Sequence, residues 1–336
     1  MLFRSGSQYL APDSASAAED LDDDLLRLIF IACHPVLSME GRVSLTLRLL
    51  GGLTPAEIAR AFLTSESAIQ QRIVRAKRTL SEARVPFEIP GAAERAQRLA
   101  SVLAVIYLIF NEGYSATAGE QWMRPALCEE ALRVGRILAE LAPAEPEVHG
   151  LVALMELQAS RTPARIDASG EPILLLKQNR ALWDQLLIRR GLAALARAQS
   201  FDGPLGPYSL QGAIAACHAR ARAAEETDWP RIVALYDALE QAQPSPIVTL
   251  NRAVAVSMAY GPAAALEIVD VLRHESRLRE YHLLPSVRGD LLERLGQFEE
   301  ARAEFSHAAS LASNARERSL LLERMAACNP HAVRIN

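Results

Sequence analysis

The feature that most constrains the fold is apolar spacing of the helical type, which recurs in nearly every segment from Ala92 to the C-terminus. Alanine and leucine dominate the composition, and aromatic residues make up only 5% of the chain. That balance favours helices packed on helices over a sheet. Because no stretch shows sustained strand alternation, we predict an all-α fold.

Breaks in the helical pattern indicate how the chain is divided. Residues 1–20 are rich in Ser, Ala and Asp without apolar periodicity, which predicts a flexible lead-in. A helix is expected from Asp22, where three acidic residues precede an apolar run. Two prolines and a glycine interrupt the pattern at 86–91. We predict a domain at 21–90 and a helical extension at 91–336.

Two features stand out in the extension. Between Arg161 and Pro172, a proline, an aspartate and a glycine predict a turn or a short hairpin. Segment 282–315 has the residue spacing of one tetratricopeptide repeat, in which small residues allow two helices to cross closely and a phenylalanine fills the gap. The residues with this spacing are Gly289, Leu292, Gly296, Ala301, Phe305 and Ala308. We predict a tetratricopeptide-like array, with an irregular helical bundle as the alternative.

Charge and ionisable residues exclude several classes of protein. The net charge of −4 excludes a molecule that binds polyanions over its whole surface, so any nucleic-acid face must be local. The seven histidines lack the spacing of metal ligands, and we predict no metal and no cofactor. The four cysteines form no CxxC motif and are expected to be small buried residues in a reducing compartment. They are Cys33, Cys128, Cys217 and Cys328.

The sequence lacks the signs of export or membrane insertion. The N-terminus shows no charged-then-apolar signal pattern. The most apolar run, at 99–110, is too short to span a bilayer. We therefore expect a cytoplasmic protein without membrane association.

Residues 54–80 predict a helix-turn-helix. Thr54 and Glu57 stand at the two positions of a capping box, and Pro55 suits the first turn of a helix that ends near Phe62. A turn at 63–65 follows, in which Ser65 is placed to cap a second helix.

This second helix is expected from Glu66 to about Leu80 and has a clear buried face. Its apolar residues recur at spacings of three and four: Ile69, Ile73, Ala76 and Leu80. The first helix supplies the opposing face with Ile58, Ala59 and Phe62. Ala59 is small enough to let the two helices cross.

The polar residues of the second helix change in type along its length. Ser67, Gln70 and Gln71 come early and carry groups that bond base edges. The later cations suit DNA phosphates and are Arg72, Arg75, Lys77 and Arg78, of which Arg72 also has a structural interpretation. The segment from 60 to 84 holds six basic and two acidic residues, so the positive patch is local. We infer a DNA-binding helix, with a solvated basic hairpin as the alternative.

Residues 53–80 resemble region four of extracytoplasmic-function RNA polymerase sigma factors, most closely at 57–59 and 72–77. Further segments resemble one subgroup of these factors, whose members carry a long tetratricopeptide-like extension. These segments are 106–114, 206–218 and 246–254. The resemblance covers nearly all of the chain after Leu21.

The resemblance implies a sigma factor-like transcription initiation protein. Region four of such proteins binds the promoter −35 element and contacts the flap of core RNA polymerase. In this chain it implies base reading by Ser67, Gln70 and Gln71 and backbone contacts by the later cations. The helical array is expected to bind a protein partner.

The chain departs from the family pattern in two respects. Leu63 stands in the turn where many helix-turn-helix motifs have glycine. Region two, which opens the −10 element and grips polymerase, has no counterpart before Leu21. The sequence therefore resembles an N-terminally shortened sigma factor, and we expect it to fail to start transcription by itself.

Three other functions compete with this interpretation. An enzyme is suggested by polar clusters at 111–114, 183–184 and 227–229, but the chain has no glycine-rich phosphate loop and no nucleophile elbow. We predict no enzymatic activity and no catalytic residues. A helical-repeat interaction scaffold and a stand-alone DNA-binding regulator remain as alternatives.

Overall fold

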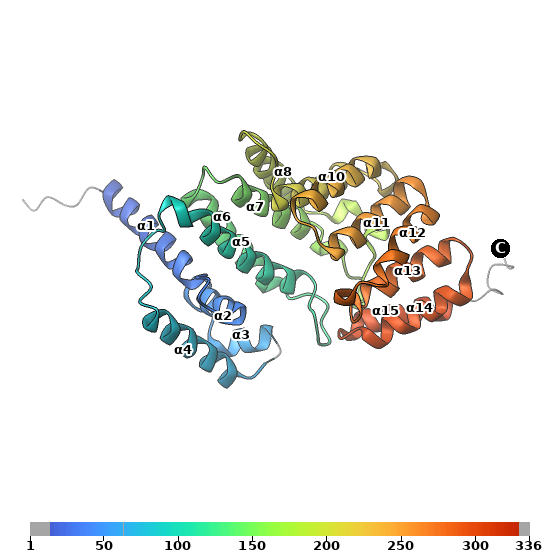
Figure 1. Cartoon of the computed structure of the whole chain (residues 1–336), viewed down its shortest axis with the longest axis horizontal. Coiled ribbons are helices and arrows are strands. Elements are labelled where there is room, and N and C mark those ends of the chain that lie inside the picture. Colours follow the sequence, from blue (N-terminus) through green and yellow to red (C-terminus); the bar gives the residue numbers. More distant parts are fainter. Residues whose placement is uncertain (1–13, 63, 329–336) are drawn as a thin grey trace, which may run out of the picture. The chain divides into compact units, whose positions relative to one another are not determined.

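The protein is helical throughout the part that its computed structural model describes, which is residues 14–62 and 64–328 (Figure 1). These residues form fifteen α-helices and no strand, so the predicted all-α fold is confirmed. The first helices are α1 (Ser14–Ala32), α2 (Met39–Leu49), α3 (Pro55–Ala61), α4 (Glu66–Glu82) and α5 (Ala92–Tyr114). The others are α6 (Pro125–Leu141), α7 (Pro146–Ala159), α8 (Gln185–Gln199), α9 (Pro207–Arg220), α10 (Trp229–Ala242), α11 (Pro246–Tyr260), α12 (Pro262–Leu272), α13 (Leu283–Arg294), α14 (Phe298–Leu311) and α15 (Ala315–Ala327).

Helix α1 begins at Ser14, earlier than the start predicted at Asp22. The flexible lead-in predicted for 1–20 is therefore wrong from Ser14 onward, and residues 1–13 lie outside the described part. Alanine-rich sequence has a high helix propensity even without an apolar face, which explains the longer helix.

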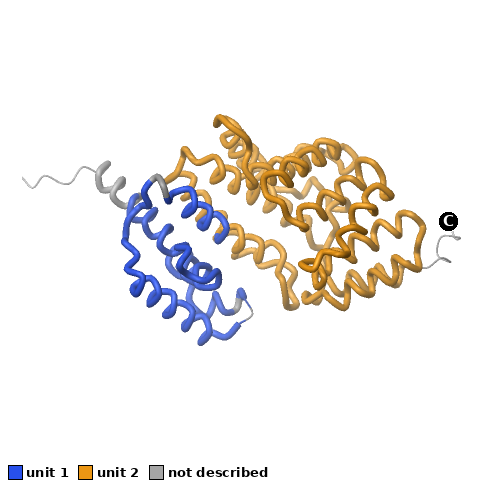
Figure 2. Tube along the Cα trace, viewed as in Figure 1, with its two compact units in different colours: residues 1–105 blue, residues 106–336 orange. Residues whose placement is uncertain are grey.

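The helices form two compact units, which divide between Val105 and Ile106 (Figure 2). This division falls inside α5, so that helix contributes residues to both units. The loop at 86–91, where we predicted a boundary, lies between α4 and α5. The separation into domains 21–90 and 91–336 stays a prediction.

The first half of α5 completes the first unit by bonding to the end of α1. Ser101 Oγ donates to the carbonyl of Cys33 at 2.6 Å, and Arg98 Nη2 donates to the carbonyl of Phe30 at 3.1 Å. Arg42 on α2 donates to Ser101 Oγ at 3.0 Å. Carbonyls at a helix C-terminus have no partner within their own helix, so these bonds satisfy groups that burial would otherwise leave unpaired.

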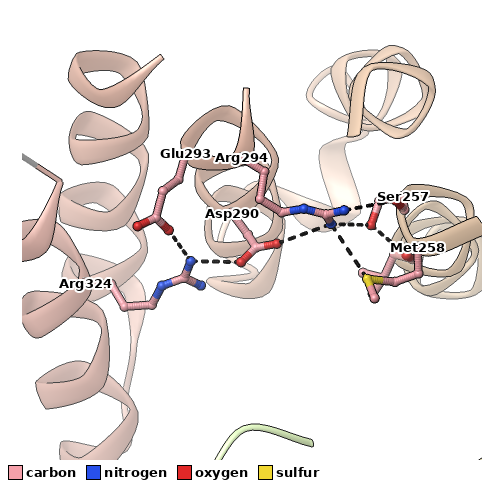
Figure 3. A network of polar contacts seen from close by, with 7 residues as sticks. Ser257, Met258, Asp290, Glu293, Arg294 and Arg324 are labelled. Carbon is pink, nitrogen blue, oxygen red and sulfur yellow. Dashed lines mark hydrogen bonds and ion pairs between the residues drawn. The ribbon is translucent and has the colours of Figure 1, made fainter. Parts of the chain in front are cut away.

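The second unit is built by successive helices that pack on one another from α6 onward. A polar network links three of them (Figure 3). Arg324 on α15 contacts Asp290 at 2.8 Å and also contacts Glu293, and both acids lie on α13. Arg294 on α13 donates to Ser257 Oγ on α11 at 2.9 Å. These charge-assisted bonds link α11, α13 and α15.

Helices α13 and α14 cross at small residues, as the repeat spacing predicts. A Cβ atom added to Gly289 would lie 2.9 Å from the Phe305 ring, which leaves no room for a side chain there. Phe305, Ala301 and Ala308 are fully buried around this crossing. The crossing is confirmed, and the assignment to the tetratricopeptide class stays a prediction.

The turn predicted between Arg161 and Pro172 is also confirmed. Ile166 and Pro172 form an isolated antiparallel bridge, and Gly170 between them has a φ of +83°. Asp167 Oδ1 accepts hydrogen bonds from backbone N–H groups within the turn.

We expect Gly289→Leu to destabilise the second unit by about 1–3 kcal/mol, because the new side chain collides with the Phe305 ring. The measurement is the free energy of unfolding in urea. Ala303→Leu is the control, because Ala303 lies on α14 with its side chain exposed. Equal stability of the two variants would contradict the tight crossing.

Candidate nucleic-acid interface

The capping box that starts α3 forms as predicted. The backbone N–H of Thr54 donates to Glu57 Oε2 at 2.7 Å, and the backbone N–H of Glu57 donates to Thr54 Oγ1 at 3.2 Å. Two otherwise unpaired N–H groups are thus satisfied by one pair of side chains, which fixes where α3 begins.

The turn and the start of α4 also follow the prediction. The backbone N–H of Thr64 donates to the carbonyl of Ala59 at 3.0 Å, and Ser65 Oγ accepts from the N–H of Ala68 at 3.2 Å. Ser65 is therefore the N-cap of α4. Leu63, the residue that replaces the usual glycine, lies outside the described part.

The predicted buried face of α4 is correct at three of its four residues. Ile69, Ile73 and Ala76 are buried, and Leu80 is half-buried near the helix end. The face packs on α2 and α3, where Ile58 and Ala59 are buried. A Cβ atom added to Gly41 of α2 would lie 3.6 Å from the Cβ of Ala76, so α2 and α4 approach closely at this point.

The opposite face of α4 is an exposed stripe, and we call it the recognition face. It lines a shallow surface depression formed by Ser67, Gln70, Gln71, Val74, Arg75 and Arg78. These positions recur at the three- and four-residue spacing that places side chains on one side of a helix. Three predicted base-reading residues and two predicted backbone cations therefore share one surface.

The other two predicted cations lie at the flanks of this face. Lys77 is exposed and does not line the depression, and Arg72 is half-buried. The pKa of Glu40 lies below its ordinary value because its own backbone N–H and the Ser38 hydroxyl bond to its carboxylate, and the charge of Arg72 adds to this effect. Arg72 thus stabilises an acid on α2, in line with its structural interpretation.

Three residues of the recognition face already have polar partners. Ser67 Oγ lies 3.1 Å from the Oγ of Ser65, the N-cap of α4, and the other two residues bond within the helix. Gln70 Nε2 donates to Glu66 Oε1 at 2.9 Å, and Arg78 Nε donates to Glu82 Oε1 at 2.6 Å. Both contacts are exposed, so each is weak enough to be exchanged for a ligand. Gln71 and Arg75 have no polar partner among the described residues, which leaves them available for DNA.

Val74 is a residue of the recognition face that the sequence analysis missed. Its side chain is 65% exposed and lies between the amides and the cations. The signal was present, because Val74 falls outside the spacing of the buried residues. An exposed apolar side chain on a polar helix face suits contact with a thymine methyl group.

The backbone adopts an unusual conformation two residues after the end of α4. Arg84 has a φ of +48°, the left-handed conformation that favours glycine. The backbone N–H of Val85 donates to the carbonyl of Leu80 at 3.1 Å and closes the helix end. The chain thus carries a cation where an uncharged glycine is the relaxed choice.

The other polar clusters of the chain have structural partners. Glu112, from the cluster at 111–114, accepts hydrogen bonds from Thr117 and Arg124 and is buried with Arg124 as an ion pair. Asp184 caps α8, and Asp228 caps α10. Within the described ranges no group of His, Cys, Asp and Glu side chains is arranged to hold a metal ion. In the same part of the chain, every helix is too short or too polar to cross a bilayer.

Comparison with known families agrees with this geometry. Residues 27–80 match the family Sigma-70, region 4, and this match spans α2, α3 and most of α4. Residues 98–199 match a family of unknown function, DUF6596. The chain thus carries a Sigma-70 region 4 domain, which is a DNA-binding module, and this supports a sigma-factor-like protein.

A similar protein aligns with most of the chain. An uncharacterized protein of Rhizobium meliloti (strain 1021) is 51% identical over 295 residues, and the alignment covers 88% of this chain and 69% of that protein. The chain belongs to the same family as this protein.

We expect Arg84→Gly to stabilise the end of α4 by about 0.5–1 kcal/mol, because glycine adopts the left-handed conformation without a steric penalty. The measurement is native-state hydrogen exchange of the last amides of α4. Arg84→Ala removes the same charge and keeps the penalty, so its exchange rates should stay close to those of the parent chain. Equal effects of the two variants would show that charge, and not backbone strain, decides stability there.

Proposed function

We propose that this protein binds the −35 element of promoters through α4 and acts as a sigma factor-like transcription initiation protein, similar to the extracytoplasmic-function type. The observation that carries the proposal is the recognition face, a polar and cationic stripe on the second helix of a capped helix-turn-helix. The match to region 4 supports it independently. Such a protein acts in the cytoplasm, where promoter DNA and RNA polymerase are found.

Base reading is assigned to the early part of the recognition face. Gln71 is exposed and carries groups that bond base edges. Ser67 and Gln70 do so after exchanging their contacts with Ser65 and Glu66. Val74 adds contact with a thymine methyl. The N-terminal half of a recognition helix enters the major groove, which places these side chains nearest the bases.

Backbone contacts are assigned to the cations of α4, namely Arg72, Arg75, Lys77 and Arg78. Phosphate contacts supply most of the affinity and make it dependent on salt. Arg75 is the strongest candidate because its side chain is exposed and no acid within the described chain pairs with it. Arg78 must exchange Glu82 for a phosphate, so its net contribution is smaller.

Association with core RNA polymerase follows from the same family relation. Region 4 of sigma factors contacts the polymerase flap, and the helical array of the second unit offers a surface for a further protein partner. If polymerase does not bind, the recognition face still supports a stand-alone DNA-binding regulator. If duplex DNA does not bind, a helical-repeat scaffold is the better explanation.

We expect Arg75→Ala in the full chain to weaken binding to every duplex and to reduce the salt slope of log K by about one. Gln71→Ala should instead weaken binding to the preferred duplex by about 1–3 kcal/mol and change binding to other duplexes little. The measurement is fluorescence anisotropy with a panel of duplexes obtained by selection, at several salt concentrations.

Arg95→Ala is the control for charge, because Arg95 is an exposed cation of the first unit that lies on α5. It should leave affinity and salt slope nearly unchanged. Equal losses on all duplexes for Gln71→Ala would refute its role in base reading, and equal effects of Arg75→Ala and Arg95→Ala would refute the phosphate assignment.

We expect the full chain to bind purified core RNA polymerase in the absence of DNA, measured by analytical ultracentrifugation. Arg75→Ala should leave this association unchanged, because that side chain is assigned to DNA. Retention of DNA binding together with no polymerase complex at micromolar concentration would favour the stand-alone regulator.

A further inference from the structure

The second unit contains a pocket of about 300 Å³ that the sigma-factor function does not use. Its walls come from the end of α5, the segment before α6, the turn region at 161–178, and helices α13 and α15. Asn314 joins two of these walls, because its Nδ2 donates to the carbonyls of Ala116 at 3.2 Å and Gln121 at 3.0 Å. The Arg316–Glu171 ion pair joins α15 to the turn region.

Two arginines give one side of this pocket its charge. Arg165 is only 5% exposed, and its Cζ lies 3.5 Å from the centre of the Tyr114 ring and 4.3 Å from that of Trp122. Arg161 Cζ lies 5.6 Å from the centre of the same Tyr114 ring. The pKa of Arg165 is lowered by burial, and the nearby charge of Arg161 lowers it further.

Neither arginine has a carboxylate partner within the described chain. Arg165 uses only Nη1, which donates to the carbonyl of Tyr114 and to Met123 Sδ, and Arg161 uses only Nη2, which donates to the Tyr114 hydroxyl at 2.6 Å. A buried charge without an opposite charge is costly, and two like charges side by side are more so. A bound anion would relieve this cost.

Other polar atoms at the pocket also lack partners within the described part. They are Trp122 Nε1, Arg161 Nε and Gln178 Oε1, all buried. One acid, Glu317, lines the pocket; it lies 3.2 Å from His282 Nε2, and its charge also acts on Arg165. Two guanidinium groups against one carboxylate leave the pocket with a net positive charge.

Much of the remaining lining of the pocket is apolar. It includes Ile173, Leu175, Leu283, Leu320 and Leu321. A site that combines guanidinium groups with aliphatic side chains matches a ligand with an anionic head and an apolar body.

We propose that this pocket binds a small organic anion, whose carboxylate or phosphate head is held by Arg161 and Arg165 and whose apolar body lies against the aliphatic side chains of the lining. The ligand contacts three separate wall segments, so binding stabilises the second unit. The inference does not depend on DNA binding by the first unit.

The test uses the full chain with octanoate and octyl phosphate as probes, followed by calorimetry and by tryptophan fluorescence. 1-Octanol has the same apolar body without the anion, and inorganic phosphate has the anion without the body. We expect saturable binding of at least one octyl anion, at least tenfold tighter than 1-octanol or inorganic phosphate. Preference for octyl phosphate or for octanoate identifies the head group.

Arg165→Gln and Arg161→Gln should each weaken binding of that probe about tenfold or more. Arg197→Gln is the matched control, because Arg197 stacks on Phe201 at 4.9 Å away from the pocket. Leu320→Trp places a larger side chain in the pocket and should weaken binding while both arginines stay in place. It therefore tests the site without removing the arginine contacts, in case an arginine variant fails to fold. Equal affinity for 1-octanol, or unchanged affinity in all three pocket variants, would overturn the proposal.

Discussion

Close crossing of helices at small residues is the constraint on which both units depend. In the first unit α2 approaches α4 at Gly41 and Ala76, and in the second α13 approaches α14 at Gly289 and Phe305. A chain with few aromatic residues has little side-chain bulk with which to fill wide gaps between helices. Short interhelical distances keep the packing dense and allow Ala and Leu to supply most of the core.

The crossing in the first unit also decides what α4 presents to solvent. With Ile69, Ile73 and Ala76 held against α2 and α3, the recognition face must point outward. The two caps, at Thr54 and Ser65, set where each helix begins and therefore which residue meets which face. The exposure of the surface that we propose for DNA binding follows from packing and capping.

The second unit places its charges differently. Arg324 and Arg294 are paired with acids or hydroxyl groups and hold helices together, whereas Arg161 and Arg165 stack on aromatic rings and form no ion pair within the described residues. The paired arginines contribute to stability, and this role is enough to explain them. Unpaired buried charges of the second kind indicate a site, because the protein keeps them despite the cost of desolvation.

The sequence by itself determined the helix-turn-helix, its caps, the buried and exposed sides of α4, and the turn near Gly170, because each depends on spacing within a few residues. It missed Val74 because only polar residues of the second helix were considered as DNA contacts, and it started α1 too late because helix propensity without apolar periodicity was not used. Tertiary structure alone decided that α5 contributes to both units and that Arg72 lies near Glu40. It also decided that Tyr114, Trp122 and Arg165 meet α13 and α15 at one pocket. Contacts between residues far apart in the chain depend on how whole helices pack, and local spacing carries no information about them.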